Sequence, residues 1–336
     1  MMSGTIQIAH GGGGRLSAEL IEAEILPRFG KGPLQGLPDA ANLPVPSSSR
    51  ILFSTDSFVV SPWSFPGGNI GHLAVHGTLN DLSVSGGRPL WLSLSLILEE
   101  GLPLDTLRQV LDSVKEAAES CGVKVVTGDT KVVGRGQCDS LYINSSGIAE
   151  ALPGFELSPA KIRPGDLIIA SGPLGSHGMA ILAAREPKSI KKGPLSDTGS
   201  VHRLVAAAQP WAASVRFMRD PTRGGAAASL NEAVATAPCQ LVLEEAKIPY
   251  EPAAKALAEM LGLELLSSPS EGRLLMICAA DAAEKILEAW RGLPEAAGAA
   301  IIGHAEEGVR RVLLATVAGG RRIVDMPSGE LLPRIC

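Results

Sequence analysis

Strand-length apolar runs alternate with helix-length amphipathic segments along most of this chain. In the first half the predicted strands are residues 51–54, 90–98, 123–127 and 141–148. Apolar residues at helical spacing predict two helices between them, at 71–83 and 104–120. Strands and helices interleaved in this way are typical of a layered α/β or α+β domain.

A second domain of the same kind follows. Proline and glycine interrupt the periodicity at 151–154 and 163–166. Beyond them we predict strands at 167–170, 241–243, 273–279, 299–305 and 311–316, with helices at 177–185, 202–208, 224–235, 252–261 and 282–291. The length of 336 residues also favours two domains. We therefore divide the chain into a glycine-rich segment (1–50), an N-terminal domain (51–152), a C-terminal domain (153–325) and a mobile tail (326–336).

Composition excludes several classes of protein. The net charge is −5 with both signs interspersed, which argues against a nucleic-acid-binding protein. The most apolar run, residues 90–98, is too short to span a membrane, and the first residues lack the features of a signal peptide. None of the five cysteines stands in a Cys-x-x-Cys pair, so we expect reduced thiols in the cytoplasm and no zinc site.

Four aspartates stand near the ends of predicted elements: Asp56, Asp81, Asp129 and Asp220. Each is flanked by small or polar residues rather than lying on a charged helix face. Dispersed carboxylates of this kind can bind magnesium together with phosphate oxygens and water. Aspartate is equally suited to capping a helix or a turn. The spacing alone leaves both interpretations open.

Other residues are also candidates. The run Gly11–Gly14 exposes backbone amides that can wrap phosphates, although it fits no established phosphate motif and suits a flexible linker equally well. Lys131 and Glu271 lie on predicted loops beside strands, where site residues are common, but ordinary solvated charges are common there too. His72 and His76 stand four apart on a predicted helix, and we favour a packing role over metal binding.

The last residue of the chain is Cys336. An accessible thiol is a soft nucleophile. The ten residues 327–336 span about 33 Å when extended, so the thiol can visit a partner's active site and return. A chance cysteine on a frayed, unpacked end is the alternative interpretation.

Ten segments together resemble one family, the hydrogenase maturation factors HypE, within the superfamily of aminoimidazole ribonucleotide (AIR) synthetase. The segments, in family order, are HGGGG at 10–14, STDSF at 54–58, VHGTLNDL at 75–82, GRP at 87–89, TGDTKV at 127–132, RPGD at 163–166, GSHG at 175–178, RDPTRGG at 219–225, PSEG at 269–272 and PRIC at 333–336. The resemblance covers nearly the whole chain, and the terminal PRIC is its most specific part.

The resemblance implies a two-domain AIR synthetase-like fold of the α/β (α+β) class, a homodimer formed by the N-terminal domains, and ATP with Mg²⁺ as cofactors. It implies that a carbamoyltransferase, HypF, loads Cys336, that ATP drives dehydration of the thiocarboxamide to a thiocyanate, and that a HypC–HypD scaffold receives the cyano group for a [NiFe]-hydrogenase. The site residues that it implies are Cys336, Glu271 and Lys131 for catalysis; Asp56, Asp81 and Asp129 for the metal; and Gly11, Gly12, Gly13, Gly14, Asp56, Asp81, Asp129, Asp220, Thr222 and Arg223 for ATP.

Three alternatives are weighed against this interpretation. Selenophosphate synthetase works with a cysteine or selenocysteine near its glycine-rich segment, whereas the first cysteine here is Cys121. Thiamine monophosphate kinase needs no terminal cysteine and leaves Cys336 unexplained. A nucleotide-regulated carrier or adaptor would use the tail only for docking, and its mass would stay unchanged in a carbamoylation assay.

Overall fold

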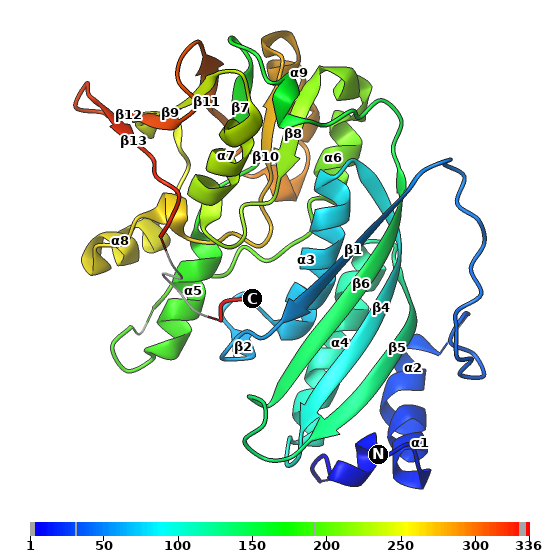
Figure 1. Cartoon of the computed structure of the whole chain (residues 1–336). Coiled ribbons are helices and arrows are strands. Elements are labelled where there is room, and N and C mark those ends of the chain that lie inside the picture. Colours follow the sequence, from blue (N-terminus) through cyan, green and yellow to red (C-terminus); the bar gives the residue numbers. More distant parts are fainter. Residues whose placement is uncertain (1–3, 31, 191, 329–333) are drawn as a thin grey trace.

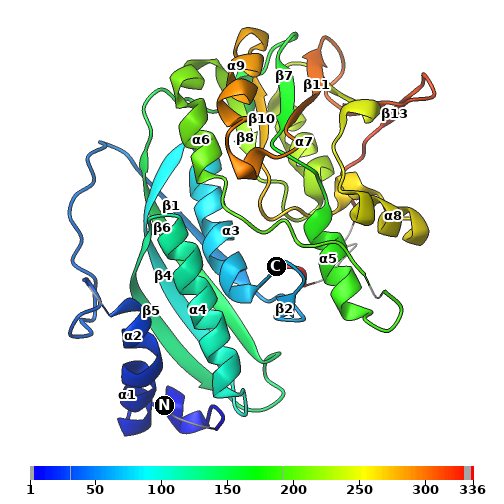
Figure 2. The same cartoon turned by 180° about the vertical axis from the view of Figure 1, so that it is seen from behind.

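The structure is a computed structural model that describes residues 4–30, 32–190, 192–328 and 334–336. Two domains are stacked end to end, each built on its own sheet (Figure 1). Seen from behind, α3 runs along the four-stranded sheet toward the upper domain, and the C-terminus lies between the domains (Figure 2). The fold therefore matches the expected two-domain α/β (α+β) class.

The N-terminal domain carries a four-stranded sheet in the order β1-β6-β4-β5, in which only β4 and β5 are parallel. Its elements are β1 (Ile51–Phe58), α3 (Ile70–Val84), β4 (Gly87–Glu99), α4 (Leu104–Ser120), β5 (Lys124–Val133) and β6 (Leu141–Ala151). The helices cover one face because their apolar stripes match the alternating leucines of β4. Leu107, Val110 and Val114 of α4 are buried on the predicted face.

The other face of this sheet carries apolar side chains on three neighbouring strands. Phe53 pairs with Ile148, which in turn pairs with Trp91. Phe53 is 67% exposed. Because successive residues of a strand point to opposite faces, Asp56 and Phe58 point instead toward α3, where a Cβ added at Gly77 would touch both side chains.

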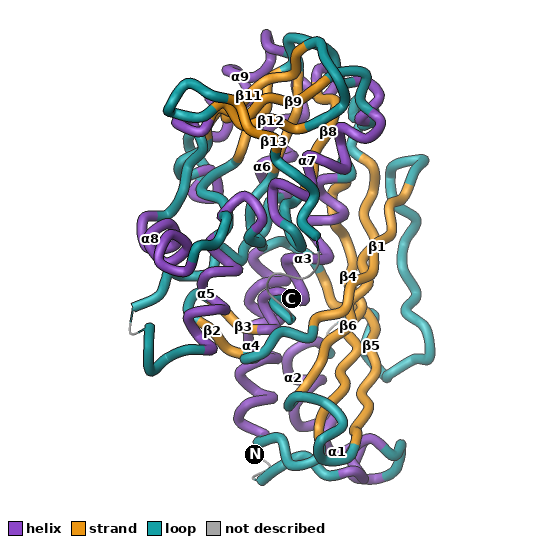
Figure 3. Tube along the Cα trace, turned by 60° about the vertical axis from the view of Figure 1, so that its left-hand side comes forward, coloured by secondary structure: helices purple, strands orange, loops and turns teal. Residues whose placement is uncertain are grey.

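The C-terminal domain carries a seven-stranded sheet in the order β13-β12-β9-β11-β7-β10-β8. Its strands are β7 (Leu167–Ala170), β8 (Val215–Arg219), β9 (Gln240–Glu244), β10 (Leu275–Cys278), β11 (Ala300–Glu306), β12 (Val312–Ala315) and β13 (Arg321–Ile323). Its helices are α5 (Ser176–Arg185), α6 (His202–Ala208), α7 (Gly225–Thr236), α8 (Pro252–Leu261) and α9 (Ala280–Trp290). The tube view shows this sheet above the interdomain region that holds the chain end (Figure 3).

The first fifty residues, described above only as a glycine-rich segment, contain helical structure. α1 (Arg15–Leu20), a π-helical turn (Ile21–Ile25) and α2 (Leu26–Phe29) form one continuous helical segment. This segment packs beside β5 and α4. A short hairpin, β2 (Ser64–Phe65) and β3 (Gly68–Asn69), was not predicted.

Several predicted boundaries are wrong in a way that matters for the site. β1 and β5 extend beyond the apolar runs, so Asp56 and Asp129 lie within strands rather than after them. Pairing with β6 and β4 continues through these polar residues and overrides their low strand propensity. β8, which immediately precedes Asp220, was not predicted at all. In the described part of the chain, no helix is long and apolar enough to cross a membrane.

Candidate active site

Four carboxyl groups from both domains meet between the sheets, and we call them the acidic cluster: Asp56, Asp81, Asp220 and Glu271. Asp56 comes from β1, Asp81 from the last turns of α3, Asp220 follows β8, and Glu271 lies on the loop before β10. Burial raises the pKa of each of these carboxyl groups. The structure thus brings together three of the four predicted aspartates with the predicted catalytic glutamate.

The charges within the cluster reinforce the effect of burial. The Ser54 hydroxyl donates a 2.8 Å hydrogen bond to Asp81 Oδ2, which favours the carboxylate, but Asp56 opposes it and the pKa of Asp81 is raised. Burial, followed by repulsion from Asp81, raises the pKa of Asp220 to about 7. The cluster therefore resists carrying its full negative charge and attracts cations.

Glu271 is held by its backbone while its carboxyl group is largely unpaired. Its amide donates to Asp197 Oδ1 at 3.0 Å, and its carbonyl accepts from Asn80 Nδ2 and the Gly199 amide, each at 3.3 Å. The side chain is 2% exposed, and Oε1 has no hydrogen-bond partner. Burial raises the pKa of Glu271 well above its ordinary value, with Asp220 next in effect. The carboxyl group therefore keeps its proton to a higher pH than an ordinary glutamate does.

Cys336 lies beside this carboxyl group. The Arg223 guanidinium hydrogen-bonds the thiol, and burial followed by the charge of Glu271 raises the pKa of Cys336 to about 12. The backbone amide of Val59 donates to a terminal carboxylate oxygen of Cys336 at 3.0 Å. Thr222 lies in the turn after Asp220, where its amide donates to the Asp220 carbonyl at 3.0 Å.

The expectation of an unpacked chain end is wrong for residues 334–336. Ile335 is 3% exposed and belongs to the apolar core of the N-terminal domain. The end packs because an apolar side chain, two backbone carbonyls and a terminal carboxylate oxygen all find partners there. The rest of the predicted tail includes 329–333, which lie outside the described residues, and its mobility stays a prediction.

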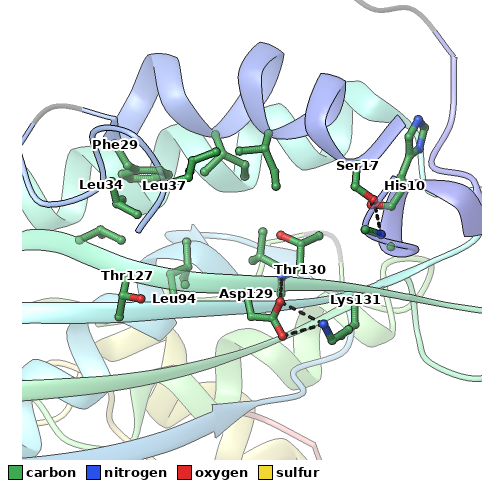
Figure 4. Close-up of a pocket in the computed structure, with 17 residues that line it drawn as sticks. His10, Ser17, Phe29, Leu34, Leu37, Leu94, Thr127, Asp129, Thr130 and Lys131 are labelled. Atoms are coloured by element: carbon green, nitrogen blue, oxygen red, sulfur yellow. Dashed lines mark hydrogen bonds and ion pairs between the residues drawn. The ribbon is translucent and has the colours of Figure 1, made fainter. Parts of the chain in front are cut away.

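A second group of predicted residues gathers elsewhere, where the N-terminal segment meets β5 (Figure 4). Lys131 Nζ lies 3.0 Å from Asp129 Oδ2, and both side chains are more than half exposed. Gly11 lies so close to β5 that an added Cβ would be 2.5 Å from the Val132 amide nitrogen. These residues border a cavity of about 210 Å³ whose far wall is apolar and includes Ile25 and Phe29. Gly12 and Gly14 adjoin its rim, beside Gly13, whose amide donates to Ser17 Oγ at 2.9 Å.

One chain does not unite the two groups. Across the sheet, Asp129 of β5 is in register with Ser95 of β4, Asn144 of β6 and Ser57 of β1. Three strand spacings therefore separate the backbone of Asp129 from that of Ser57, about 14 Å. Asp56, next to Ser57, points to the opposite face. Lys131 is thus separated from Glu271 in the single chain.

Sequence reasoning missed the residues that hold the site in place. Asn80 bridges the domains, since Nδ2 also donates to the Gly199 carbonyl at 2.9 Å and Oδ1 accepts from the Val201 amide at 2.9 Å. Its place beside Asp81 was the available signal. Asp197 and the α5 residues His177 and Arg185 contact the Glu271 loop or the chain end, and only His177 lay in a quoted motif.

The donor chemistry of the acidic cluster fits a hard cation. Magnesium takes few protein oxygens and completes its shell with phosphate and water. Among the residues that the structure describes, no group of three or more His, Cys, Asp or Glu side chains is arranged to hold a metal ion on its own.

Two family models match the chain. "AIR synthase related protein, N-terminal domain" matches residues 38–151, and "AIR synthase related protein, C-terminal domain" matches 163–314. The chain is 45% identical to carbamoyl dehydratase HypE of Rhodobacter capsulatus, with 98% of each chain covered. It is 41% identical to carbamoyl dehydratase HypE of Escherichia coli K12, covering 98% of this chain and 99% of the relative.

Solved structures agree with these relatives. The structure titled "Crystal Structure of Hydrogenase Maturation Protein HypE in complex with ATP" matches with a TM-score of 0.94 and 40% identity, covering 99% of this chain and all of that one. A HypE–HypF complex matches at 0.80 and 37% identity, covering 94% and 100%. Thiamine monophosphate kinase of Aquifex aeolicus, at 0.59 and 20% identity over 81% and 89%, shares the fold alone.

Proposed function

The chain belongs to the HypE family of carbamoyl dehydratases, and we propose that it dehydrates a carbamoyl group carried on its own Cys336. In this reaction the thiocarboxamide R–S–CO–NH₂ and ATP become the thiocyanate R–S–CN, ADP and phosphate. The cyano group then supplies the cyanide ligand of the iron in a [NiFe]-hydrogenase. The observation that carries the proposal is that the docked chain end brings the Cys336 thiol close enough to Glu271 and Arg223 for both charged groups to act on it.

The chemistry requires a better leaving group and a base. Transfer of a phosphoryl group to the carboxamide oxygen makes that oxygen a good leaving group, and removal of the two N–H protons then forms the nitrile. Glu271 is the candidate base. Burial, followed by the charge of Asp220 and the other carboxylates, raises the pKa of Glu271 in the free chain. Positive charge bound in the acidic cluster would oppose the part of this shift that comes from charge, so we expect Glu271 to be a better base when the site is loaded.

We place the metal at the acidic cluster. Asp56 and Asp81, with Asp220 beside them, offer the carboxylate oxygens that Mg²⁺ accepts alongside phosphate. Bound there, the ion would neutralise phosphate charge. Arg223, next to Thr222, already faces Asp56 and Cys336 and supplies a fixed positive charge on the same side.

We place the nucleotide in the cavity beside the N-terminal segment. The apolar wall suits a flat adenine ring, whereas the opposite rim carries Lys131 and the segment Gly11–Gly14 (Figure 4). To bind a phosphate, the Gly12 and Gly13 amides would exchange their present bonds to the Ala9 carbonyl and Ser17 Oγ for phosphate oxygens. Asp129 at this rim is the third predicted metal ligand.

A homodimer brings the two groups together. In this dimer the two four-stranded sheets pack face to face, and a two-fold axis between them runs parallel to the strands. This symmetry places β1 of one copy opposite β5 of the other. The row of Phe53, Ile148 and Trp91 gives this face its apolar surface. Lys131 and Asp129 of one copy then lie opposite β1 of the other, the strand that carries Asp56 of the acidic cluster. This arrangement accounts for their separation in the single chain.

The other proposed assignments follow from the reaction. A HypF carbamoyltransferase loads Cys336, and a HypC–HypD complex accepts the cyano group. All five cysteines are free, which supports the reducing cytoplasm as its location.

The test is a measurement of intact mass. The protein is incubated with a HypF carbamoyltransferase, carbamoyl phosphate and ATP. We expect the gain of one carbamoyl group followed by the loss of one water. A Cys336→Ala variant is the control and should stay unchanged. If the wild-type protein gains the carbamoyl group on Cys336 but does not lose water, the proposed reaction is contradicted and a carrier function remains.

A further inference from the structure

The last three residues are held in the site through their backbone. The Ser61 amide donates to the Arg334 carbonyl at 3.2 Å, and the Val59 amide donates to a terminal carboxylate oxygen of Cys336 at 3.0 Å. The chain end thus runs along residues 59–61, immediately after β1. None of these hydrogen bonds involves the thiol.

Helix α5 supplies the other side of the binding site for the chain end. We call this site, formed by residues 59–61 and α5, the seat. His177 Nε2 lies 2.7 Å from the Ile335 carbonyl oxygen. Arg185 Nη2 donates to the Arg334 carbonyl at 2.6 Å, and Arg185 Nε donates to the Ser61 carbonyl at 2.7 Å. Eight residues along a helix are a little over two turns and span about 12 Å, so both side chains lie on one face of α5. Arg185 bridges the two segments, and His177 holds the residue next to the thiol.

The hydrogen bonds of His177 orient its ring. The Ile335 carbonyl can only accept, so Nε2 of the neutral imidazole carries the proton, and Nδ1 accepts from the Ser196 hydroxyl at 2.8 Å; Ser196 Oγ itself accepts from the Thr198 amide at 3.1 Å. The imidazole is buried, and Phe65 packs edge-on against it at 5.4 Å.

The same loop reaches the candidate base. Asp197, between Ser196 and Thr198, accepts the Glu271 amide through Oδ1. The segment 196–199 therefore contacts His177 at one end and the backbone of Glu271 at the other.

We propose that α5 is a receptor for the C-terminal peptide of this chain, in which His177 and Arg185 act as positioning residues that bring Cys336 to Glu271. The proposed function explains why the chain end docks, and the inference rests on it to that extent. Docking itself can be measured without the reaction. The seat selects one apolar side chain, because Ile335 joins the cluster that contains Val60, Phe65 and Ile181. The Arg334 side chain is held as well, since it donates to the Val59 carbonyl at 3.2 Å, pairs with Asp139 and lies over the Tyr142 ring. The remaining contacts of the seat are to backbone oxygens.

Docking is tested by the rate at which iodoacetamide alkylates Cys336. The intact protein is treated for increasing times, and the peptide 325–336, released by cleavage before Asp325, is weighed. A buried thiol reacts from the undocked state, so its rate follows the undocked fraction. We expect His177→Ala and Arg185→Ala each to accelerate alkylation about tenfold, since each removes a hydrogen bond to a carbonyl of the seat.

Conservative variants separate positioning from general structure. Arg185→Lys and His177→Gln keep a donor and should recover part of the protection. Arg291→Ala, an exposed arginine after α9, should alkylate at the wild-type rate. Thermal denaturation confirms that each variant is folded, and Arg185→Ala, at the partly exposed end of α5, keeps the test valid if His177→Ala does not fold.

Two outcomes distinguish this proposal from the proposed function. Unchanged alkylation of Cys336 in folded Arg185→Ala and His177→Ala would overturn the receptor. The receptor is supported if both alanine variants are alkylated faster and the conservative variants restore part of the protection. This holds even if the carbamoyl-loaded wild-type protein fails to lose water. In a protein that does lose water, both variants should do so more slowly while their affinity for ATP is unchanged.

Discussion

Gly272 offers a test of Glu271 that leaves every proposed catalytic group in place. A Cβ at this position would lie 2.0 Å from the Asp197 carbonyl oxygen and 2.7 Å from the Gly199 amide nitrogen. Both atoms are backbone, so no side-chain rotation relieves the contact. The Glu271 loop and the segment 197–199 must therefore separate by a distance on the order of 1 Å.

The expected loss follows from this displacement. A misplacement of about 1 Å can slow a reaction about 10²-fold, and overpacking of a buried position costs about 1–3 kcal/mol of stability. We therefore expect Gly272→Ala to bind ATP and to accept a carbamoyl group on Cys336. It should then lose water about 10²-fold more slowly than wild type.

The assay starts from protein already carbamoylated on Cys336 and follows its intact mass after ATP is added. Gly292→Ala is the matched control, because a Cβ there meets no atom within 4 Å. Loss of water at the wild-type rate in Gly272→Ala would refute the argument that the contact with 197–199 positions Glu271. An equal slowing in Gly292→Ala would show that the effect is not specific to the site.

Three further predictions test the groups of the site. Glu271→Gln should accept a carbamoyl group yet stall before water loss, about 10²–10⁴-fold slower, because an amide is no base; intact mass checks this, and wild-type dehydration would remove Glu271 from the mechanism. Asp81→Asn and Asp129→Asn should each weaken Mg²⁺-ATP binding in calorimetry, and unchanged affinity in both would reassign them to structural roles. The folded pKa of Asp220 is raised to about 7 from 3.8, so its contribution to stability is complete below pH 4 and is lost as the pH rises through 7. Asp220→Asn should therefore raise the melting temperature at pH 8 in the absence of Mg²⁺ but not at pH 4, and a melting temperature lowered at pH 8 would contradict this.

Regular amphipathic segments were predictable because local pattern and tertiary packing agree. The bounds of α4 and α8 match their predictions, and in α8 Pro252 occupies the first turn while Gly262 ends the helix in the left-handed region. β8 was missed because a five-residue strand at the sheet edge, Val-Arg-Phe-Met-Arg, has too short a pattern to distinguish it from a loop. Since Asp220 follows β8, its position relative to Asp81 was unpredictable as well.

The site itself depends on contacts between residues far apart in sequence. The motifs identified Asp81 and Glu271 individually, but their pKa values follow from mutual proximity that only the stacked domains create. The separation of Asp129 from Asp56 shows the same limit, because the order β1-β6-β4-β5, and not the spacing along the chain, decides which carboxyl groups meet.

In the docked chain end the thiol is protonated, and the hydrogen bonds from His177 and Arg185 that hold the end do not involve the sulfur. With a pKa near 12 and a buried environment, Cys336 is protonated in the seat and is a poor nucleophile there. It must therefore leave the seat to receive a carbamoyl group. Because His177 and Arg185 bind the carbonyls of Ile335 and Arg334, the peptide can return by the same hydrogen bonds whether the sulfur carries a proton, a carbamoyl or a cyano group. Recognition of the backbone, rather than of the reacting group, is what allows one seat to serve each chemical state of the carrier.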